Sequence, residues 1–130
     1  MVFQTTTVTN SKGEVINRKA NELQKDECIV DIGHETIKQL ESLVKESKTI
    51  LWNGPLGNYE LGFQDKTEVL AKMVADVTNS ETISIVGGGD TIASINKLGL
   101  NERFTFISTG GGAMLDFLVN ETLVGIDALK

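Results

Sequence analysis

The sequence predicts an α/β fold, in which an open parallel sheet carries helices on both of its faces. Three observations predict this fold. Short apolar runs of strand length alternate along the chain with longer amphipathic stretches. A glycine-rich loop follows each of three strand-like runs. The chain has 130 residues, of which 40% are hydrophobic, and this is enough for one domain with a buried core.

The first half of the chain supplies strands and one helix. Residues 2–8 are rich in β-branched side chains and predict a strand. Residues 9–26 are polar and predict a loop. The apolar run 28–32 predicts a second strand. Residues 35–47 repeat apolar side chains at helical spacing and predict an amphipathic helix, and the apolar run 49–52 predicts a third strand.

The second half alternates regularly between strands and helices. We expect, in order, a loop at 53–57, a helix at 66–79, a strand at 82–86, a helix at 90–98, a strand at 104–108 and a helix at 113–119. Strands that alternate with helices are typical of a parallel sheet with right-handed crossovers. The expected architecture is therefore a Rossmann-like, three-layer open sheet, with no domain boundary inside the chain.

Composition excludes several classes of protein. The formal net charge is −6, which argues against nucleic-acid binding through clustered lysines and arginines. Cys28 is the only cysteine, so the sequence has neither a disulfide framework nor a cysteine-based zinc site. His34 is the only histidine, and nothing around it suggests a nucleophile paired with a base. We find no signal-peptide pattern and no apolar run of membrane-spanning length, so no membrane partner is expected.

Three loops carry the features of a phosphate site. They cover residues 53–57, 87–91 and 109–113, and the last two repeat the order strand, three glycines, helix. The carboxyl ends of parallel strands lie at one edge of a sheet, where α/β proteins bind ligands. Glycines let a ligand approach the backbone, whose N–H groups, together with the start of a helix, attract anions. The alternative is that these glycines serve tight turns and close packing.

Two common nucleotide motifs are absent. No glycine is followed by Lys-Ser or Lys-Thr, as the Walker motif requires. The dinucleotide fingerprint requires a third glycine where Ile92 and Leu115 stand. A nicotinamide-dependent dehydrogenase is therefore disfavoured.

Individual residues around the loops have two interpretations each. Asp90 is either the N-cap of its helix or a carboxylate ligand of Mg²⁺, and spacing alone favours the cap. Thr91 either contacts a phosphate or occupies a helix start. Glu60 is either a solvated charge or an acceptor for ribose hydroxyls. Pro55 is a turn residue that would also border a pocket, and Trp52 is expected in the core.

Three sequence blocks resemble the phosphoglycerate kinase family. They are residues 52–60 (WNGPLGNYE), 86–91 (VGGGDT) and 107–113 (ISTGGGA), and they match in order and spacing. Weaker similarity runs from residues 30–33 to residues 123–129. The resemblance therefore covers nearly the whole chain, and three long blocks in register are far more specific than a short motif.

The resemblance implies transfer of a phosphoryl group between 1,3-bisphosphoglycerate and ADP, with Mg²⁺ and ATP/ADP bound, as part of glycolysis in the cytoplasm. It implies that Asp90 holds the Mg²⁺ of the nucleotide, and that Gly110, Gly111 and Gly112 offer N–H groups to the phosphoryl group in transit. The implied nucleotide-binding residues are Asn53, Pro55, Glu60, Gly87, Gly88, Gly89, Asp90, Thr91 and Val30, the last beside adenine.

The sequence departs from the family pattern at a few loop positions. His34 and Val124 stand where the family usually has proline, and Lys66 stands where it usually has glycine. Asn58-Tyr59 replaces the usual Val-Phe. None of these changes removes a phosphate-binding group.

Length is the larger departure, because the family enzyme has two domains. The family enzyme is also normally a monomer. We expect residues 1–130 to be the last part of its carboxy-terminal, nucleotide-binding domain, a partial domain without the amino-terminal domain that binds phosphoglycerate. Such a chain is expected to be inactive alone and to self-associate through surfaces that the missing part covers. The alternative is a stand-alone nucleotide- or anion-binding module without catalysis.

Overall fold

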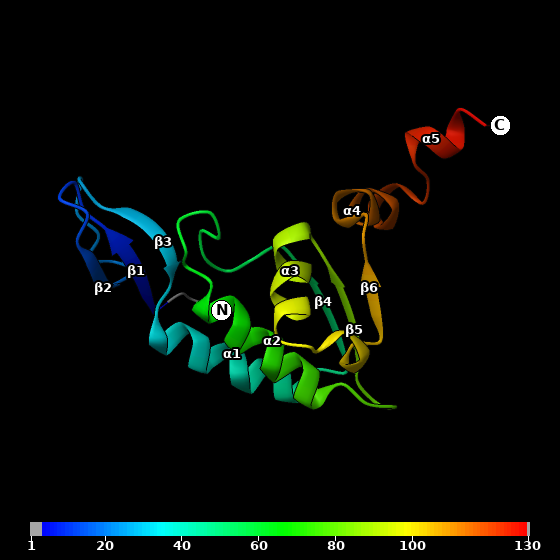
Figure 1. Cartoon of the computed structure of the whole chain (residues 1–130), viewed down its shortest axis with the longest axis horizontal. Helices are drawn as coiled ribbons and strands as arrows, with labels where there is room; N and C mark the ends of the chain where they lie inside the picture. The colour runs from blue at the N-terminus through cyan, green and yellow to red at the C-terminus, as the bar shows by residue number, and fades with distance from the viewer. Residues whose placement is uncertain (1–3, 130) are drawn as a thin grey trace.

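The computed structural model describes residues 4–129 and arranges them in two small sheets with helices beside them (Figure 1). In chain order the elements are β1 (Thr5–Thr9), β2 (Val15–Lys19), β3 (Cys28–Ile32), α1 (His34–Glu46), β4 (Thr49–Asn53), α2 (Asp65–Val77), β5 (Ile83–Gly87), α3 (Gly89–Lys97), the 3₁₀ turn η1 (Asn101–Arg103), β6 (Phe106–Ser108), α4 (Gly111–Asn120) and α5 (Val124–Asp127). The expected helices agree with α1 to α4 to within about two residues at most ends.

The amino-terminal sheet is antiparallel, with the strand order β2-β1-β3. The first expected strand corresponds to β1, and its residues 2 and 3 lie outside the described residues. The expected strand at 28–32 is confirmed as β3. However, β3 pairs with β1 and is not part of the parallel sheet.

The loop expected at 9–26 was wrong, because β2 lies inside it. This strand has only Ile16 and Arg18 half-buried, so it lacks the apolar run by which a strand is recognised. The turn before it is a hairpin turn, in which the Asn10 side-chain oxygen accepts hydrogen bonds from the N–H groups of Lys12 and Glu14, both at 3.0 Å. Pairing with β1, rather than burial of its own side chains, holds β2 in place.

The second sheet is parallel and has the order β4-β5-β6. Its register sets Asn53 opposite Gly87, and Gly87 opposite Ser108. These are the last residues of their strands, so the loops that follow all start from one edge. The α/β class and the Rossmann-like parallel sheet with its helices are therefore confirmed.

One face of the parallel sheet forms the hydrophobic core. Trp52 and Val86 point from this face and pack with Leu70 and Val74 of α2 and with Ile95 of α3, all at most 8% exposed. The helix α1 lies along α2 and extends this core toward the amino-terminal sheet (Figure 1). The expectation that Trp52 is a core residue is confirmed.

The other face of the parallel sheet stays open in the described residues. Leu51, Ile83 and Phe106 lie on it and are 48%, 45% and 57% exposed. Helix α4 approaches β5 beside Gly87, and its own apolar side chains Phe117 and Leu118 are also exposed. An apolar surface of this kind favours association.

Among residues 4–129, none of the helices has the length and apolar character that crossing a bilayer requires.

We expect the open sheet face to drive concentration-dependent self-association of this chain. Leu51→Thr combined with Phe106→Thr replaces two exposed apolar side chains on that face with β-branched polar ones that strands accept. Sedimentation velocity over a concentration series should show weaker association for this double variant. Leu43→Thr, at a comparably exposed site on α1, is the control. Equal association of the double variant and the unchanged chain would contradict this prediction.

Candidate functional site

The three glycine-rich loops meet at the carboxyl edge of the parallel sheet, backbone against backbone. The N–H of Gly54 donates to the carbonyl of Gly87 over 3.3 Å. A Cβ added to Gly88 would lie 2.9 Å from the nitrogen of Gly54, and one added to Gly111 would lie 2.6 Å from the nitrogen of Gly88. The loop after β4 therefore touches the loop after β5, which touches the loop after β6. The expectation that these loops share one edge is confirmed.

Asn53 lies at the junction of these loops. Its side-chain oxygen is 2.6 Å from the position that a Cβ on Gly87 would take, and 2.7 Å from the corresponding position on Gly111. The residue as a whole is exposed. Its amide group is thus held between two glycine loops at the surface, where a ligand at this edge can reach it.

The glycines of the two triplets fall into two groups. Gly87, Gly88 and Gly111 have no room for a side chain, because a Cβ on any of them would approach backbone or Asn53 atoms closer than 3.0 Å. Gly89 and Gly112 have nothing within 4 Å of that position, and Gly110 has only the Cβ of Ala113 at 3.7 Å. Packing therefore explains the first group. The second group leaves open backbone that packing does not require.

Both triplets lead into the first turn of a helix. The first hydrogen bond of α3 runs from Ile92 N–H to the carbonyl of Gly88, and the first of α4 from Met114 N–H to the carbonyl of Gly110. The N–H groups of residues 89–91 and 111–113 therefore have no partner within their helices. Because Gly88 touches Gly111, these two sets of free donors begin side by side.

Asp90 is the second residue of α3 and is not its cap. The N-cap is Gly88, with φ +93°, and no side chain makes a capping hydrogen bond there. The interpretation of Asp90 as an N-cap was therefore wrong. Its side chain is exposed, and the described residues offer it no hydrogen bond or ion pair.

The donor set at this edge fits a Mg²⁺ ion that arrives with a nucleotide. Among residues 4–129, no group of three or more His, Cys, Asp or Glu side chains could hold a metal ion by itself. A single free carboxylate beside a phosphate site is the arrangement that Mg²⁺ uses when phosphate oxygens and water supply its other ligands. Asp90 is an exposed carboxylate at this edge, so its chemistry is compatible with that arrangement.

Thr91 and Ser94 point into the protein. Both are fully buried, and both hydroxyl oxygens lack a hydrogen-bond partner within the described structure. The hydroxyl of Thr91 therefore does not face the loop edge. Only the backbone N–H of Thr91 remains for an anion there.

The remaining expected site residues lie on the segment that follows β4 and on β3. Pro55 is half-buried in the loop, where the neighbouring Leu56 N–H donates to the Thr67 hydroxyl over 2.9 Å. Glu60 is exposed in the following turn. Val30 is 6% exposed, and its carbonyl accepts from Asn58 N–H over 2.7 Å. The structure thus brings Val30 against this segment, with its side chain packed inside.

Sequence reasoning missed Asp31, which lies beneath the same segment. A Cβ on Gly57 would be 2.7 Å from the carboxyl carbon of Asp31. Asp31 is 5% exposed, and this burial raises the pKa of its carboxyl group, although nearby Lys66 acts in the opposite direction. The available signal was a charged residue inside the apolar run 28–32.

Comparisons with known proteins agree on one family. The family profile described as phosphoglycerate kinase matches residues 1–121. A curated phosphoglycerate kinase of Mannheimia succiniciproducens is 41% identical over 114 residues, which are 87% of this chain and 29% of that protein. The chain therefore spans less than a third of this relative's length.

Solved structures give the same result. The structure of phosphoglycerate kinase from Coxiella burnetii is similar with a TM-score of 0.79 and 33% identity, over 92% of this chain and 31% of the other. The crystal structure of phosphoglycerate kinase from Pyrococcus horikoshii is similar with a TM-score of 0.74 and 35% identity, over 92% and 30%.

Two neighbouring glycines should respond oppositely to the same substitution. Gly111→Ala forces a methyl group against the Gly88 backbone and should lower the free energy of unfolding by about 1–3 kcal/mol. Gly112→Ala meets open space inside the first turn of α4 and should raise it by up to about 1 kcal/mol. Urea denaturation of both variants measures the difference. Equal losses would show that the two glycines are not distinguished by packing.

Proposed function

The chain belongs to the phosphoglycerate kinase family, and we propose that its carboxyl sheet edge is the nucleotide half of a site that transfers a phosphoryl group between 1,3-bisphosphoglycerate and ADP. The products of this direction are 3-phosphoglycerate and ATP, and the reaction belongs to glycolysis in the cytoplasm. The proposal concerns the activity of the whole enzyme, of which this chain spans less than a third in its relatives.

One observation carries the proposal. Two helices, α3 and α4, begin side by side, and each has free backbone N–H groups in a first turn that contains glycines open to solvent. Aligned N–H groups and the positive ends of two helix dipoles attract phosphate groups. Phosphoryl transfer needs such positioning and charge stabilisation more than it needs a covalent catalyst.

The proposed roles follow the two triplets. The backbone of Gly88, Gly89 and Thr91 lies along the nucleotide phosphates, with Gly87 shaping the turn. The N–H groups of Gly110, Gly111 and Gly112 receive the phosphoryl group in transit, for which the open backbone of Gly110 and Gly112 leaves room. Asp90 holds the Mg²⁺ that neutralises the phosphates when nucleotide is bound.

The proposed contacts with the rest of the nucleotide come from the segment after β4. Asn53 contacts phosphate, Pro55 borders the base, and Glu60 accepts hydrogen bonds from the ribose hydroxyls. Val30 supports this segment from beneath, and its packed side chain makes it a backing for the adenine site rather than an exposed wall.

The acidic substrate requires cationic groups from elsewhere. The loop residues 53–57, 87–91 and 109–113 contain no lysine or arginine. We therefore assign the phosphoglycerate site to an amino-terminal domain beyond residues 1–130, which would face this edge of the sheet. The same lack of basic residues also suits the second candidate, a nucleotide- or anion-binding module without catalysis.

Asp90→Asn should weaken binding of Mg·ADP about tenfold, equivalent to about 1.4 kcal/mol, because it removes the one free carboxylate at the loop edge. Titration calorimetry with Mg·ADP measures this, and Asp76→Asn at the far end of α2 is the matched control. With EDTA in place of Mg²⁺, Asp90→Asn should bind ADP as well as the unchanged chain does. A variant that binds Mg·ADP with unchanged affinity would refute the metal role.

The purified chain should form no measurable ATP from 1,3-bisphosphoglycerate and ADP. The reason is that its loops lack the positive groups that an acidic acyl phosphate needs. A coupled assay of ATP formation measures this, with a full-length phosphoglycerate kinase as the positive control. Turnover that follows the chain through a final purification step would contradict the assignment of the substrate site to another domain.

A further inference from the structure

The segment from β4 to α2 contacts β3 of the amino-terminal sheet at Gly57 and Asn58. This segment carries Pro55 and Glu60 and leaves the parallel sheet before it returns to α2 (Figure 1). Asn58 N–H donates to the carbonyl of Val30 over 2.7 Å. Directly beside this bond, Gly57 lies against the carboxyl group of Asp31, with the Cβ position of Gly57 2.7 Å from Cγ and 2.9 Å from Oδ1. Gly57 is buried and has no space for any side chain.

Asp31 is an unusual residue for this position. It belongs to β3, an edge strand of the amino-terminal sheet, is 5% exposed, and uses Oδ1 to accept the N–H of Ile32 over 2.7 Å. No other hydrogen bond to its carboxylate and no ion pair is present among the described residues. A buried carboxylate with so few partners costs free energy. The contact with Gly57 therefore indicates a role for this buried carboxylate.

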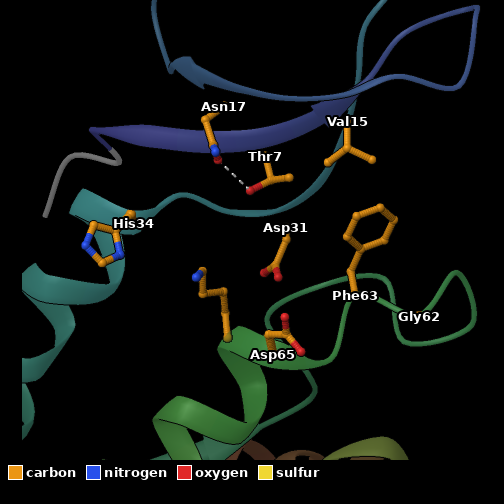
Figure 2. Close-up of a pocket in the computed structure, with 9 residues that line it drawn as sticks. Thr7, Val15, Asn17, Asp31, His34, Gly62, Phe63 and Asp65 are labelled. Carbon is orange, nitrogen blue, oxygen red and sulfur yellow. Dashed lines mark hydrogen bonds between the residues drawn. The ribbon is translucent and has the colours of Figure 1, made fainter.

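The Asp31 carboxylate also borders a cavity of about 550 Å³ between the amino-terminal sheet and the start of α2. Figure 2 shows the carboxylate in the middle of this cavity, with His34, Phe63 and Asp65 around it. The cavity gives water and protons access to a group that the rest of the fold buries. The charge of Asp31 can therefore change without opening the core.

The groups that face Asp31 come from three directions. From α2, Lys66 favours the charged carboxylate, and Asp65 opposes it. From the start of α1, His34 lines the same cavity, and the neighbouring strands β1 and β2 contribute the neutral Thr7 and Asn17. His34 and Lys66 therefore place nitrogen groups on the lining of the cavity that Asp31 borders.

We propose that Asp31 is a positioning residue for the nucleotide-binding segment 53–60, because its carboxyl group is the surface on which Gly57 rests and its charge sets how closely the segment packs on β3. This inference rests on the proposed function only for what the segment binds. The positioning itself concerns contacts within the chain.

The chemistry of the contact gives the direction. The carbonyl oxygen of Phe63 also lies close to the Cβ position of Gly57, so this carbonyl and the Asp31 carboxyl group both border that glycine. An ionised carboxylate and a carbonyl oxygen repel each other, whereas a protonated carboxyl group can donate a hydrogen bond to that carbonyl. Protonation of Asp31 therefore draws the segment onto β3, and ionisation loosens it. Burial raises the pKa of Asp31 in the folded protein, so the ionised group costs stability above that pKa and the cost disappears as pH falls.

The first test follows backbone amides by two-dimensional ¹H–¹⁵N NMR of the full chain, without nucleotide, from acidic to neutral pH. The amide signals of Gly57 and Asn58 should titrate together, with a midpoint above the ordinary pKa of an aspartate side chain. Asp31→Asn keeps an acceptor for Ile32 N–H, adds a donor for the Phe63 carbonyl, and should abolish this titration. Lys66→Gln removes the nearby cation and should move the midpoint upward, and Asp76→Asn should leave it unchanged.

Two results would overturn the proposal. One is an unchanged titration of Gly57 and Asn58 in Asp31→Asn, and the other is the absence of any titration of these amides in the unchanged chain. If Asp31→Asn does not fold, the proposal is overturned instead by Lys66→Gln leaving the titration midpoint of the Gly57 and Asn58 amides unchanged.

The second test measures the consequence for the nucleotide. Asp31→Asn should bind Mg·ADP several-fold more tightly than the unchanged chain at neutral pH, and this ratio should fall to one below the pKa of Asp31. A ratio that does not depend on pH would reduce Asp31 to a structural residue. If neither protein binds Mg·ADP, the proposed function fails, and the NMR titration still decides the positioning role.

Discussion

The close approach of three backbones at the edge of the parallel sheet is the constraint on which the rest of the structure depends. Gly88 lies against the backbone of both Gly54 and Gly111, and the Asn53 amide oxygen is the side-chain atom beside these contacts. This contact fixes where α3 and α4 begin, and so where their free N–H groups point. A side chain at Gly88 or Gly111 would push the loops apart by about its own width and separate the two helix starts. Packing therefore explains some of these glycines, such as Gly88 and Gly111. The proposed anion binding concerns their open neighbours, such as Gly89 and Gly112.

The same constraint explains how a protein of net charge −6 can be suited to phosphates. Among the described residues, seven lysines and arginines form ion pairs, as Lys97 does with Glu68 over 2.7 Å, and no lysine or arginine lies in the three loops. The attraction must come from oriented backbone dipoles, which act over a short range and only on a group that fits between them. In the proposed function such a site would select for shape, and a metal ion and cationic groups from outside these loops would balance the full charge of a nucleotide.

Much of this was predictable from the sequence, because strong local signals carry it. Apolar runs, helical periodicity and glycine triplets located β4 to β6, α1 to α4 and the shared edge. The failures lie where a contact between elements or a backbone geometry, and not the local side-chain pattern, decides the structure. The strand β2 is defined by its pairing with β1. Gly57 lies against Asp31, and residue spacing in the sequence does not reveal that contact. Asp90 had a local signal for a cap, but Gly88 already occupies that place with a backbone geometry that favours glycine.

Two aspartates, Asp90 and Asp31, show how different environments suit the same side chain to different roles. Asp90 stands in water at a helix start, where a carboxylate is stable and free to meet a cation. Asp31 is enclosed by β3 and Gly57, where its charge is costly and can act only on the chain around it. Asp90 is therefore suited to the proposed contact with a cation at the loop edge. Asp31 is suited to the proposed positioning of the segment 53–60. Because the segment 53–60 runs from the loop edge at Gly54 to a contact with β3 at Asn58, the proposed change in charge at Asp31 would act on the loop edge through this stretch of backbone.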